Sequence, residues 1–237
     1  CGGAAALAGV IVLGPREGRF GTKGEKKSMV PFAASSIPLV VLGTFLLWFG
    51  WFGFNGFSQL AMGTFDDVNA ITTIAVNTHL AGAAGTVVGA ALTRLIGGKT
   101  DIVMMLNGAL AGLVAITAEP LTPDPLLAIL IGGIGAVIMY FGTKFLESQK
   151  IDDVVGAIPV HMFAGIFGTL VVPMSNPDTD FGSQLLGVIS VCVFSFVLSY
   201  IVFKALKETI GLRISKEAEK LGTDKAEVGV VAYSIRD

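Results

Sequence analysis

Charged residues are scarce in this sequence. Only 14% of its 237 residues are Asp, Glu, Lys or Arg, whereas 53% are hydrophobic. A soluble domain normally carries about a quarter charged residues, so this composition excludes an ordinary soluble domain and indicates a membrane protein. Cysteine is also rare. Cys1 and Cys192 lie in apolar segments without metal-ligand spacing, and we interpret both as packing residues.

Familiar catalytic and nucleotide-binding motifs are missing as well. The sequence has no Walker phosphate-binding loop, no zinc-ligand spacing and no nucleophile elbow. We therefore expect a protein that is not an enzyme, with no metal site, no cofactor and no nucleic-acid partner. What the sequence contains instead is a series of long apolar runs.

Six of these runs have spanning or near-spanning length, since a helix needs about 20 residues to cross a hydrocarbon core of about 30 Å. The third is short. A further run, Cys1–Leu13, lacks the basic start of a signal peptide, and we interpret it as the second half of a helix whose first half is absent. The six runs are Ile37–Phe57, Val68–Thr93, Ile102–Ala118, Leu126–Phe145, Val154–Met174 and Leu185–Phe203.

Basic residues are missing from every second loop between these runs. The loops near Asp66–Asp67, Glu119–Asp124 and Asp178–Asp180 contain none, so all 16 Lys and Arg lie in the alternate loops and the C-terminal tail. Polytopic membrane proteins keep their basic loops in the cytoplasm. The pattern therefore predicts a multi-pass cell-membrane protein whose tail is cytoplasmic. The basic residues are Arg16, Arg19, Lys23, Lys26, Lys27, Arg94, Lys99, Lys144, Lys150, Lys204, Lys207, Arg213, Lys216, Lys220, Lys225 and Arg236.

Glycine is abundant, and part of it recurs at a spacing of four residues inside the runs. Gly85 and Gly89 form one such pair, and Gly108 and Gly112 form another. Small residues at this spacing let helix backbones approach closely in lipid. These pairs predict tight helix packing and not chemistry.

His161 is an ionisable residue in the apolar stretch GAIPVHMFAGIFG, residues 156–168. A helix beginning at Val154 would place it about 12 Å along the axis, near the bilayer midplane. Two interpretations stay open at this point: a buried neutral histidine bonded to a neighbouring helix, or a pore or proton-relay group. Pro159 removes a backbone donor in the same turn. Asp152 and Asp153 precede the helix, where they are expected to cap it and to interact with its dipole.

The stretch LLWFGWFGFNGFS, residues 46–58, is the second unusual feature. Phe54 and Ser58 are four residues apart and share a helix face. They form either part of an aromatic belt at the membrane interface or a site that holds a small cation by a hydroxyl oxygen and a ring face. His79 is interpreted as a structural, helix-bonded residue and Thr117 as a packing residue.

Taken together, four stretches resemble the ammonium transporter family (Amt/Mep/Rh), in the family's order and over nearly the whole chain. They are WFGWFGFN, NGALAGLVAITA, DDVVGAIPVH and the tail GLRISKEAEKLGTDKAEVGVVAY. The resemblance implies an all-α polytopic membrane protein containing the end of helix 5, helices 6–11 and a cytoplasmic tail. On this basis residues 1–206 are expected to form the transmembrane ammonium transporter domain, which includes the second inverted repeat and lacks its N-terminal half, and residues 207–237 the cytoplasmic C-terminal tail.

The resemblance also assigns roles to particular residues. It implies that Ser58 binds ammonium at the outer mouth and that Phe54 is one of two phenylalanines gating the pore. His161 is expected to be one of a pair of pore histidines, the other lying two residues before Cys1. Trp51 and Asp153 are expected to support the site structurally.

Four positions depart from the family's pattern. Phe57 stands where a glycine usually precedes the binding serine, and Met162 stands where a glycine usually follows the histidine. Gly156 replaces a frequent aspartate, and Val228 replaces the histidine of the tail's His-Gly pair. We expect Phe57 and Met162 to add bulk beside the path.

The resulting primary hypothesis is an ammonium transporter that recruits ammonium at its outer mouth, deprotonates it and conducts ammonia through an apolar pore. An ammonium sensor with little or no transport, coupled to a C-terminal signalling domain, is the alternative, and an accessory membrane subunit without a site is a third. The resemblance further implies a homotrimer in membrane lipid and a PII-type signalling protein as a partner of the tail.

Overall fold

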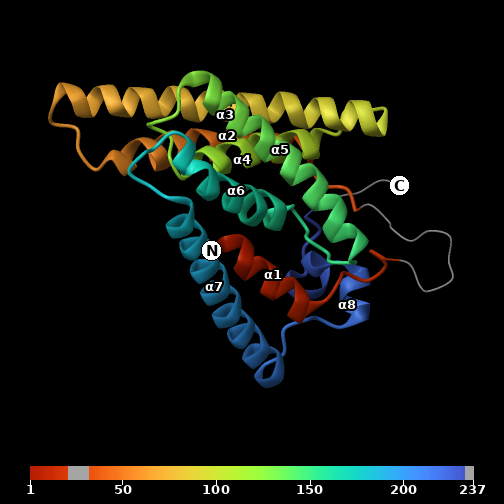
Figure 1. Ribbon diagram of the computed structural model, residues 1–237. Helices are drawn as coiled ribbons and strands as arrows, with labels where there is room; N and C mark the ends of the chain where they lie inside the picture. The colour runs from red at the N-terminus through yellow and green to blue at the C-terminus, as the bar shows by residue number, and fades with distance from the viewer. Residues whose placement is uncertain (21–31, 233–237) are drawn as a thin grey trace.

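The chain folds entirely into helices in the part that the computed structural model describes, residues 1–20 and 32–232 (Figure 1). Lys23, Lys26, Lys27 and Arg236, which the topology prediction includes, lie outside the described residues. The helices are α1 (Gly2–Leu13), α2 (Ile37–Gly56), η1 (Phe57–Gln59), α3 (Phe65–Gly97), α4 (Ile102–Thr117), α5 (Pro125–Ser148), η2 (Ile158–Phe163), α6 (Ala164–Val171), η3 (Val172–Met174), α7 (Phe181–Thr209), α8 (Lys216–Leu221) and η4 (Asp224–Val228).

Each of the long helices begins at a side-chain cap. The residue before the helix accepts a hydrogen bond from a first-turn amide, which would otherwise have no partner. Thr64 and Asp67 form a reciprocal capping box at the start of α3. The other caps are Ser36 for α2, Asp101 for α4, Asp124 for α5 and Asp180 for α7.

The six predicted apolar runs all form helices, so the predicted all-α fold is confirmed. Four of the helical segments are long and apolar enough to cross a membrane: Ile37–Gln59, Phe65–Gly97, Pro125–Ser148 and Phe181–Thr209. Ile102–Thr117 and Ile158–Met174 are apolar but shorter. The chain is a multi-pass helical membrane protein by these criteria.

The centre of the molecule is formed by α3, α4 and α5, whose backbones touch at glycine. A Cβ atom added at Gly85 would overlap the carbonyl oxygen of Gly108, and one at Gly112 would overlap the carbonyl oxygen of Ala81. Gly89 also lies against the Gly108 backbone, its added Cβ only 3.4 Å from Cα of Gly108. The predicted packing role of the glycine pairs is therefore confirmed.

The helices at the two edges of the molecule are far less covered. No residue of α7 is buried, and α2 buries only Thr44, Asn55 and Gly56. Figure 1 shows α7 extending away from the α3–α5 layer, with α1 beside it. Gly9 of α1 permits this contact, because a Cβ there would lie 3.0 Å from the Phe203 ring.

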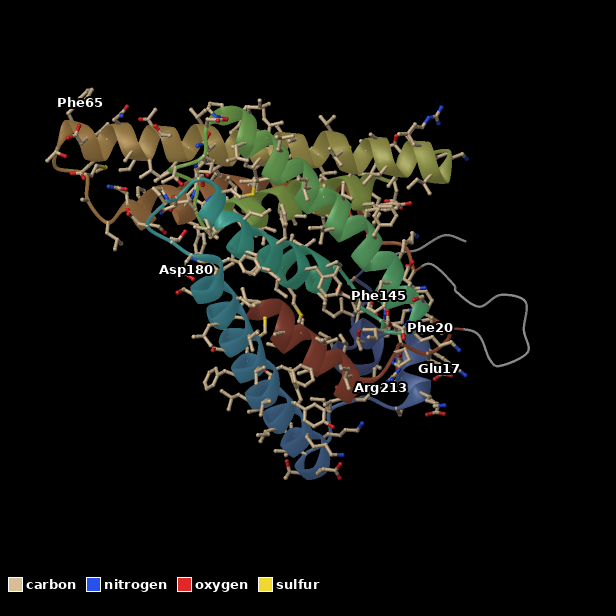
Figure 2. The ribbon with its side chains drawn as sticks, viewed as in Figure 1. Glu17, Phe20, Phe65, Phe145, Asp180 and Arg213 are labelled. Carbon is tan, nitrogen blue, oxygen red and sulfur yellow. The ribbon has the colours of Figure 1, made fainter. Side chains whose placement is uncertain are left out.

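Three of the basic segments lie together at one end of the molecule. Arg19 pairs with Glu147 in the last turn of α5, and Arg213 of the tail pairs with Glu219, which also accepts the amide of Glu17. Figure 2 shows Glu17 and Arg213 at one end, with Phe65 and Asp180 at the opposite one. This clustering is what the predicted one-sided arrangement of basic loops requires.

The expected helix start at Val154 is wrong. Residues 154–156 are bends, and the helix begins at Ile158 as a π-helical turn, so His161 lies in its first turn. The estimate of 12 Å along the axis therefore fails. The cause is local: Gly156 has a left-handed φ of +78°, which interrupts the helix, and Pro159 has no amide proton.

Candidate functional site

The end of α2 places Ser58 beside Phe54. The Ser58 hydroxyl, in η1, donates to the Phe54 carbonyl oxygen at 2.6 Å, while the Phe54 ring is 64% exposed. Because this bond uses the hydroxyl proton, the remaining lone-pair capacity of the Ser58 oxygen is directed elsewhere. The pair thus presents an acceptor oxygen and a ring at the exposed end of α2, a combination that attracts a small cation.

Trp51 is fixed behind this pair by Thr117, a residue whose bonding role the sequence interpretation missed. Its indole Nε1 donates to the Thr117 hydroxyl at 2.8 Å, and the Thr117 hydroxyl donates onward to the Leu113 carbonyl at 2.6 Å. The Trp51 and Phe54 rings meet edge to face, with centroids 6.3 Å apart. Thr117 is therefore a hydrogen-bonding partner of the aromatic stretch and not simply a packing residue.

Asn55 is a second residue that the sequence interpretation missed. It is 2% exposed, and its amide donates to the Thr78 hydroxyl at 3.0 Å, joining α2 to α3. A lone amide inside an apolar run was the available signal, because a buried polar side chain needs a partner on a neighbouring helix. This bond helps to hold the last turn of α2, and with it Phe54, against α3.

His161 lies in the π-helical turn η2, where Pro159 alters the backbone bonding. The Ala164 amide donates to the Pro159 carbonyl, five residues back. Turns of this kind are rare and occur frequently at functional sites. The His161 side chain is exposed, on an element that packs against α1. Among the described residues, no hydrogen bond or ring contact joins His161 to Ser58 or Phe54.

Asp153 caps the His161 helix, as the sequence predicts. Its carboxylate accepts the amides of Gly156, Ala157 and Ile158 at 3.0, 3.0 and 2.7 Å. These are the unpaired donors at a helix start, and a carboxylate is also favoured there by the helix dipole. Asp153 therefore determines where the turn that carries His161 begins.

Asp152 has a different role from the predicted cap. It is 7% exposed and accepts hydrogen bonds from the Arg16 backbone and side chain. Burial alone would raise the pKa of Asp152, but the hydrogen bonds and charge of Arg16, with the charge of Arg19, hold it below its ordinary value. The capping prediction is therefore wrong for Asp152, which is an ion-pair residue.

His79 packs between two rings of α2, in agreement with its interpretation as a structural residue. Its ring centroid lies 5.5 Å from that of Trp48 and 6.2 Å from that of Phe52, stacked on the latter at 18°. These contacts join α3 to the part of α2 that leads up to Phe54.

The structure shows the surroundings of three of the positions that depart from the family's pattern: Gly156, Met162 and Phe57. Gly156 has its left-handed φ, and a Cβ there would lie 2.6 Å from the Asn107 amide nitrogen, so an aspartate would be strained and crowded. The backbone of Met162 lies against Gly3 of α1, where an added Cβ would approach within 2.5 Å. Phe57 is 71% exposed at the same end of α2 as Ser58.

Comparison with known proteins agrees with this architecture. The model of the Ammonium Transporter Family matches residues 1–233. The ammonium transporter Amt2 of Archaeoglobus fulgidus is 39% identical, over 98% of this chain and 52% of its own length. Amt1 of Haloferax mediterranei is 36% identical, over 98% of this chain and 47% of its own. The chain thus spans about half the length of these relatives.

Solved structures show the same likeness. A protein described as a sensor Amt protein superposes with a TM-score of 0.86 at 34% identity, over 95% of this chain and 56% of its own. Candida albicans Mep2 superposes with a TM-score of 0.79 at 28% identity, over 96% and 53%. Fold and comparisons define the class as multi-pass helical membrane proteins. Within that class, the chain belongs to the ammonium transporter family.

Proposed function

We propose that this chain forms the second half of an ammonium-conducting pore, with residues 1–206 in the membrane domain and 207–237 in a cytoplasmic tail. The observation that carries the proposal is the end of α2. There the Ser58 hydroxyl donates to the Phe54 carbonyl and leaves acceptor capacity beside an exposed Phe54 ring. An ammonium ion, with four N–H donors and a positive charge, matches an oxygen acceptor next to a ring face.

The apolar path beyond the mouth explains why a histidine is needed. A bare cation in a low-dielectric pore pays a large desolvation penalty. If ammonium gives its proton to an imidazole, the nitrogen continues as neutral ammonia. K⁺ has no proton to give, so this step discriminates between two ions of similar size. His161 is the proposed acceptor on this chain.

The partner of His161 is proposed to lie two residues before Cys1, on the helix that ends at Leu13. Gly3 touches the Met162 backbone, and a position two residues before Cys1 is four residues before Gly3, on the same helix face. A histidine there would lie one turn along α1 from the contact with η2. A neutral imidazole has one donor and one acceptor nitrogen, so two such rings pair without a buried net charge.

The test is ammonium flux in proteoliposomes that contain the complete transporter. We expect His161→Leu to lower ammonium-driven flux and its selectivity over K⁺ at least about a hundredfold, the lower end of the range for losing a proton-transfer group. His79→Leu is the matched control, because His79 packs between rings and is assigned no role in the path. Normal flux and selectivity in a folded His161→Leu protein would exclude the relay.

An ammonium sensor is the second candidate, favoured by the likeness to a protein described as a sensor Amt protein. Phe57 and Met162, where the family usually has glycine, add side chains at the mouth and within η2, respectively. In this case Ser58 and His161 form a recognition site for ammonium. Binding there would change the conformation of the tail, and no ammonium would be conducted. Wild-type protein that binds ammonium in proteoliposomes without measurable flux would establish the sensor and exclude the transporter.

A homotrimer in membrane lipid is the proposed assembly. An apolar groove of about 530 Å³ between α3 and α5, together with the exposed face of α2, provides surface that needs an apolar partner. Light scattering of the complete protein in detergent tests the trimer.

A PII-type protein is a proposed partner of the tail. Deletion of 211–237 tests this role, and unchanged flux and regulation after the deletion would exclude it.

A further inference from the structure

A buried ion pair connects the end of α1 to the segment that starts the His161 helix. Arg16 follows α1, and its Nε and terminal nitrogen donate to the two oxygens of Asp152, each at 2.8 Å. The Arg16 backbone amide adds a third bond, at 2.9 Å. The Asp152 side chain is only 3% exposed, whereas that of Arg16 is 34% exposed. This is the planar two-point pairing in which arginine exceeds lysine.

Neighbouring groups reinforce the pair. Arg19 Nε lies 3.5 Å from Oδ1 of Asp152. The same Arg19 guanidinium pairs with Glu147 at the end of α5. Hydrogen bonding to Asp152 raises the pKa of Arg16, against the opposing effect of burial. Two cations from one loop therefore hold a single carboxylate.

The next residue transmits this restraint to the helix. Asp153 accepts the amides of Gly156, Ala157 and Ile158, so the two neighbouring carboxylates bind in different directions. Asp152 binds the loop after α1, and Asp153 binds the first turn of η2. Movement of Asp152 would therefore displace the cap and the π-helical turn behind it.

A second contact joins the same two elements. The Gly3 backbone lies against Met162, directly after His161. The ion pair holds η2 at its starting end and the Gly3 contact holds it inside the helix, so together they set the register between α1 and η2. Catalytic and transport groups are sensitive to such register, because a displacement of about 1 Å lowers rates strongly.

We propose that Arg16 is a positioning residue for His161: by clamping Asp152, it fixes the start of η2 relative to α1. The proposal rests on the proposed function, in which His161 faces the path. It predicts that Arg16 influences the conduction step more than ammonium binding at Ser58, because the clamp acts on η2 and not on the end of α2.

The test compares Arg16→Gln, Arg16→Lys and the matched control Arg94→Gln in the complete protein reconstituted in lipid. Arg94 is a second arginine, whose side chain donates to the Gly98 carbonyl in an exposed turn away from Asp152. Two measurements do not depend on transport: amide hydrogen exchange across residues 154–160, and the ¹⁵N-histidine NMR signal of His161, assigned with His161→Gln. The third measurement is the flux and its KM.

For Arg16→Gln we expect exchange at 156–158 to rise about tenfold, as a local opening would produce, while exchange in α4 and α5 stays unchanged. The His161 signal should shift and the His79 signal should not. Maximal flux should fall about fivefold with KM within about twofold, the pattern of a lost conduction step. Arg16→Lys should recover part of each effect, since lysine keeps the charge but not the two-point geometry.

Unchanged exchange at 156–158, or an unmoved His161 signal, would overturn the positioning role, as would exchange that rises equally in α4 and α5. Normal maximal flux in Arg16→Gln despite a shifted His161 signal would overturn it too. A wild-type protein without flux would refute the proposed transport function instead. In that case exchange and the His161 signal still decide whether Arg16 positions His161.

Discussion

At the scale of single residues, the neighbouring aspartates Asp152 and Asp153 have different structural roles. Asp152 is buried in an ion pair with Arg16, whereas Asp153 accepts three amides at the start of η2. Sequence reasoning predicts the role of Asp153 from its place before a helix. It cannot predict that of Asp152, because Arg16 is 136 residues away and the pair depends on how α1 meets η2.

Ser58→Ala is expected to weaken ammonium or methylammonium binding. One hydrogen bond to a charged group is worth about 1.5–3 kcal/mol, which corresponds to roughly a tenfold to hundredfold change in the dissociation constant. Binding to the complete protein is measured by calorimetry, with Ser190→Ala on the exposed face of α7 as control. Unchanged affinity in a folded Ser58→Ala protein would contradict the cation site and favour the interpretation of residues 46–58 as an aromatic belt at the membrane interface.

The Asp152 pair predicts a pH dependence of stability. Its folded-state pKa lies below the ordinary value of 3.8, so the folded protein binds fewer protons than the unfolded chain near that pH. The contribution is fully present above 3.8 and disappears as the pH falls through the folded-state pKa.

Asp152→Asn should therefore be less stable than wild type at pH 7, by about 3 kcal/mol, the lower end for broken buried pairs. The lower end applies because the Arg16 side chain is 34% exposed. The difference in melting temperature should narrow as the pH is lowered below 3.8, toward the folded-state pKa of Asp152. A difference that stays constant over this range would show that the Asp152 charge does not stabilise the fold.

At the scale of elements, the glycine contacts between α3 and α4 make a prediction about packing. Gly85→Ala places a Cβ atom on the Gly108 carbonyl oxygen, so the helices must separate. Overpacking of this kind costs about 1–3 kcal/mol. Gly97→Ala, at the end of the same helix with nothing within 4 Å of its added Cβ, is the matched control. Measured by thermal unfolding in detergent, the midpoint temperature should fall for Gly85→Ala and stay at the wild-type value for Gly97→Ala. Equal midpoints for the two variants would contradict the contact between Gly85 and Gly108.

The elements themselves were largely predictable, because apolar length and the spacing of glycine act locally along the chain. The start of the His161 helix was not. An apolar run from Val154 to Met174 is what a spanning helix requires, yet Gly156 and Pro159 interrupt its first part. The bond from Trp51 to Thr117 was equally hidden, because a threonine in an apolar helix often bonds only its own backbone.

At the scale of the whole molecule, the loops without Lys or Arg are kept apart from the loops that hold the ion pairs. Asp124 and Asp180 accept first-turn amides of α5 and α7, and Asp67 accepts the amide of Thr64, the residue that caps α3. The loops without Lys or Arg therefore begin these helices with carboxylates. The opposite loops and tail hold the ion pairs of Arg16, Arg19 and Arg213. The ion pairs therefore gather the basic segments around Arg16 and Arg213 at one end, apart from the loops without Lys or Arg.

This separation predicts the topology of the chain in the membrane. In a variant with Cys1 and Cys192 replaced, single cysteines at Asp66 and Asp178 should react with an impermeant thiol reagent added outside intact cells. Cysteines at Lys99 and Lys220 should react only after the membrane is opened, because positive loops are retained in the cytoplasm. Lys99 is the decisive position, since it belongs to the one basic loop without an ion pair to the Arg16 and Arg213 group among the described residues. Labelling of Lys99 and Lys220 from opposite sides would refute the one-sided arrangement and, with it, the cytoplasmic tail.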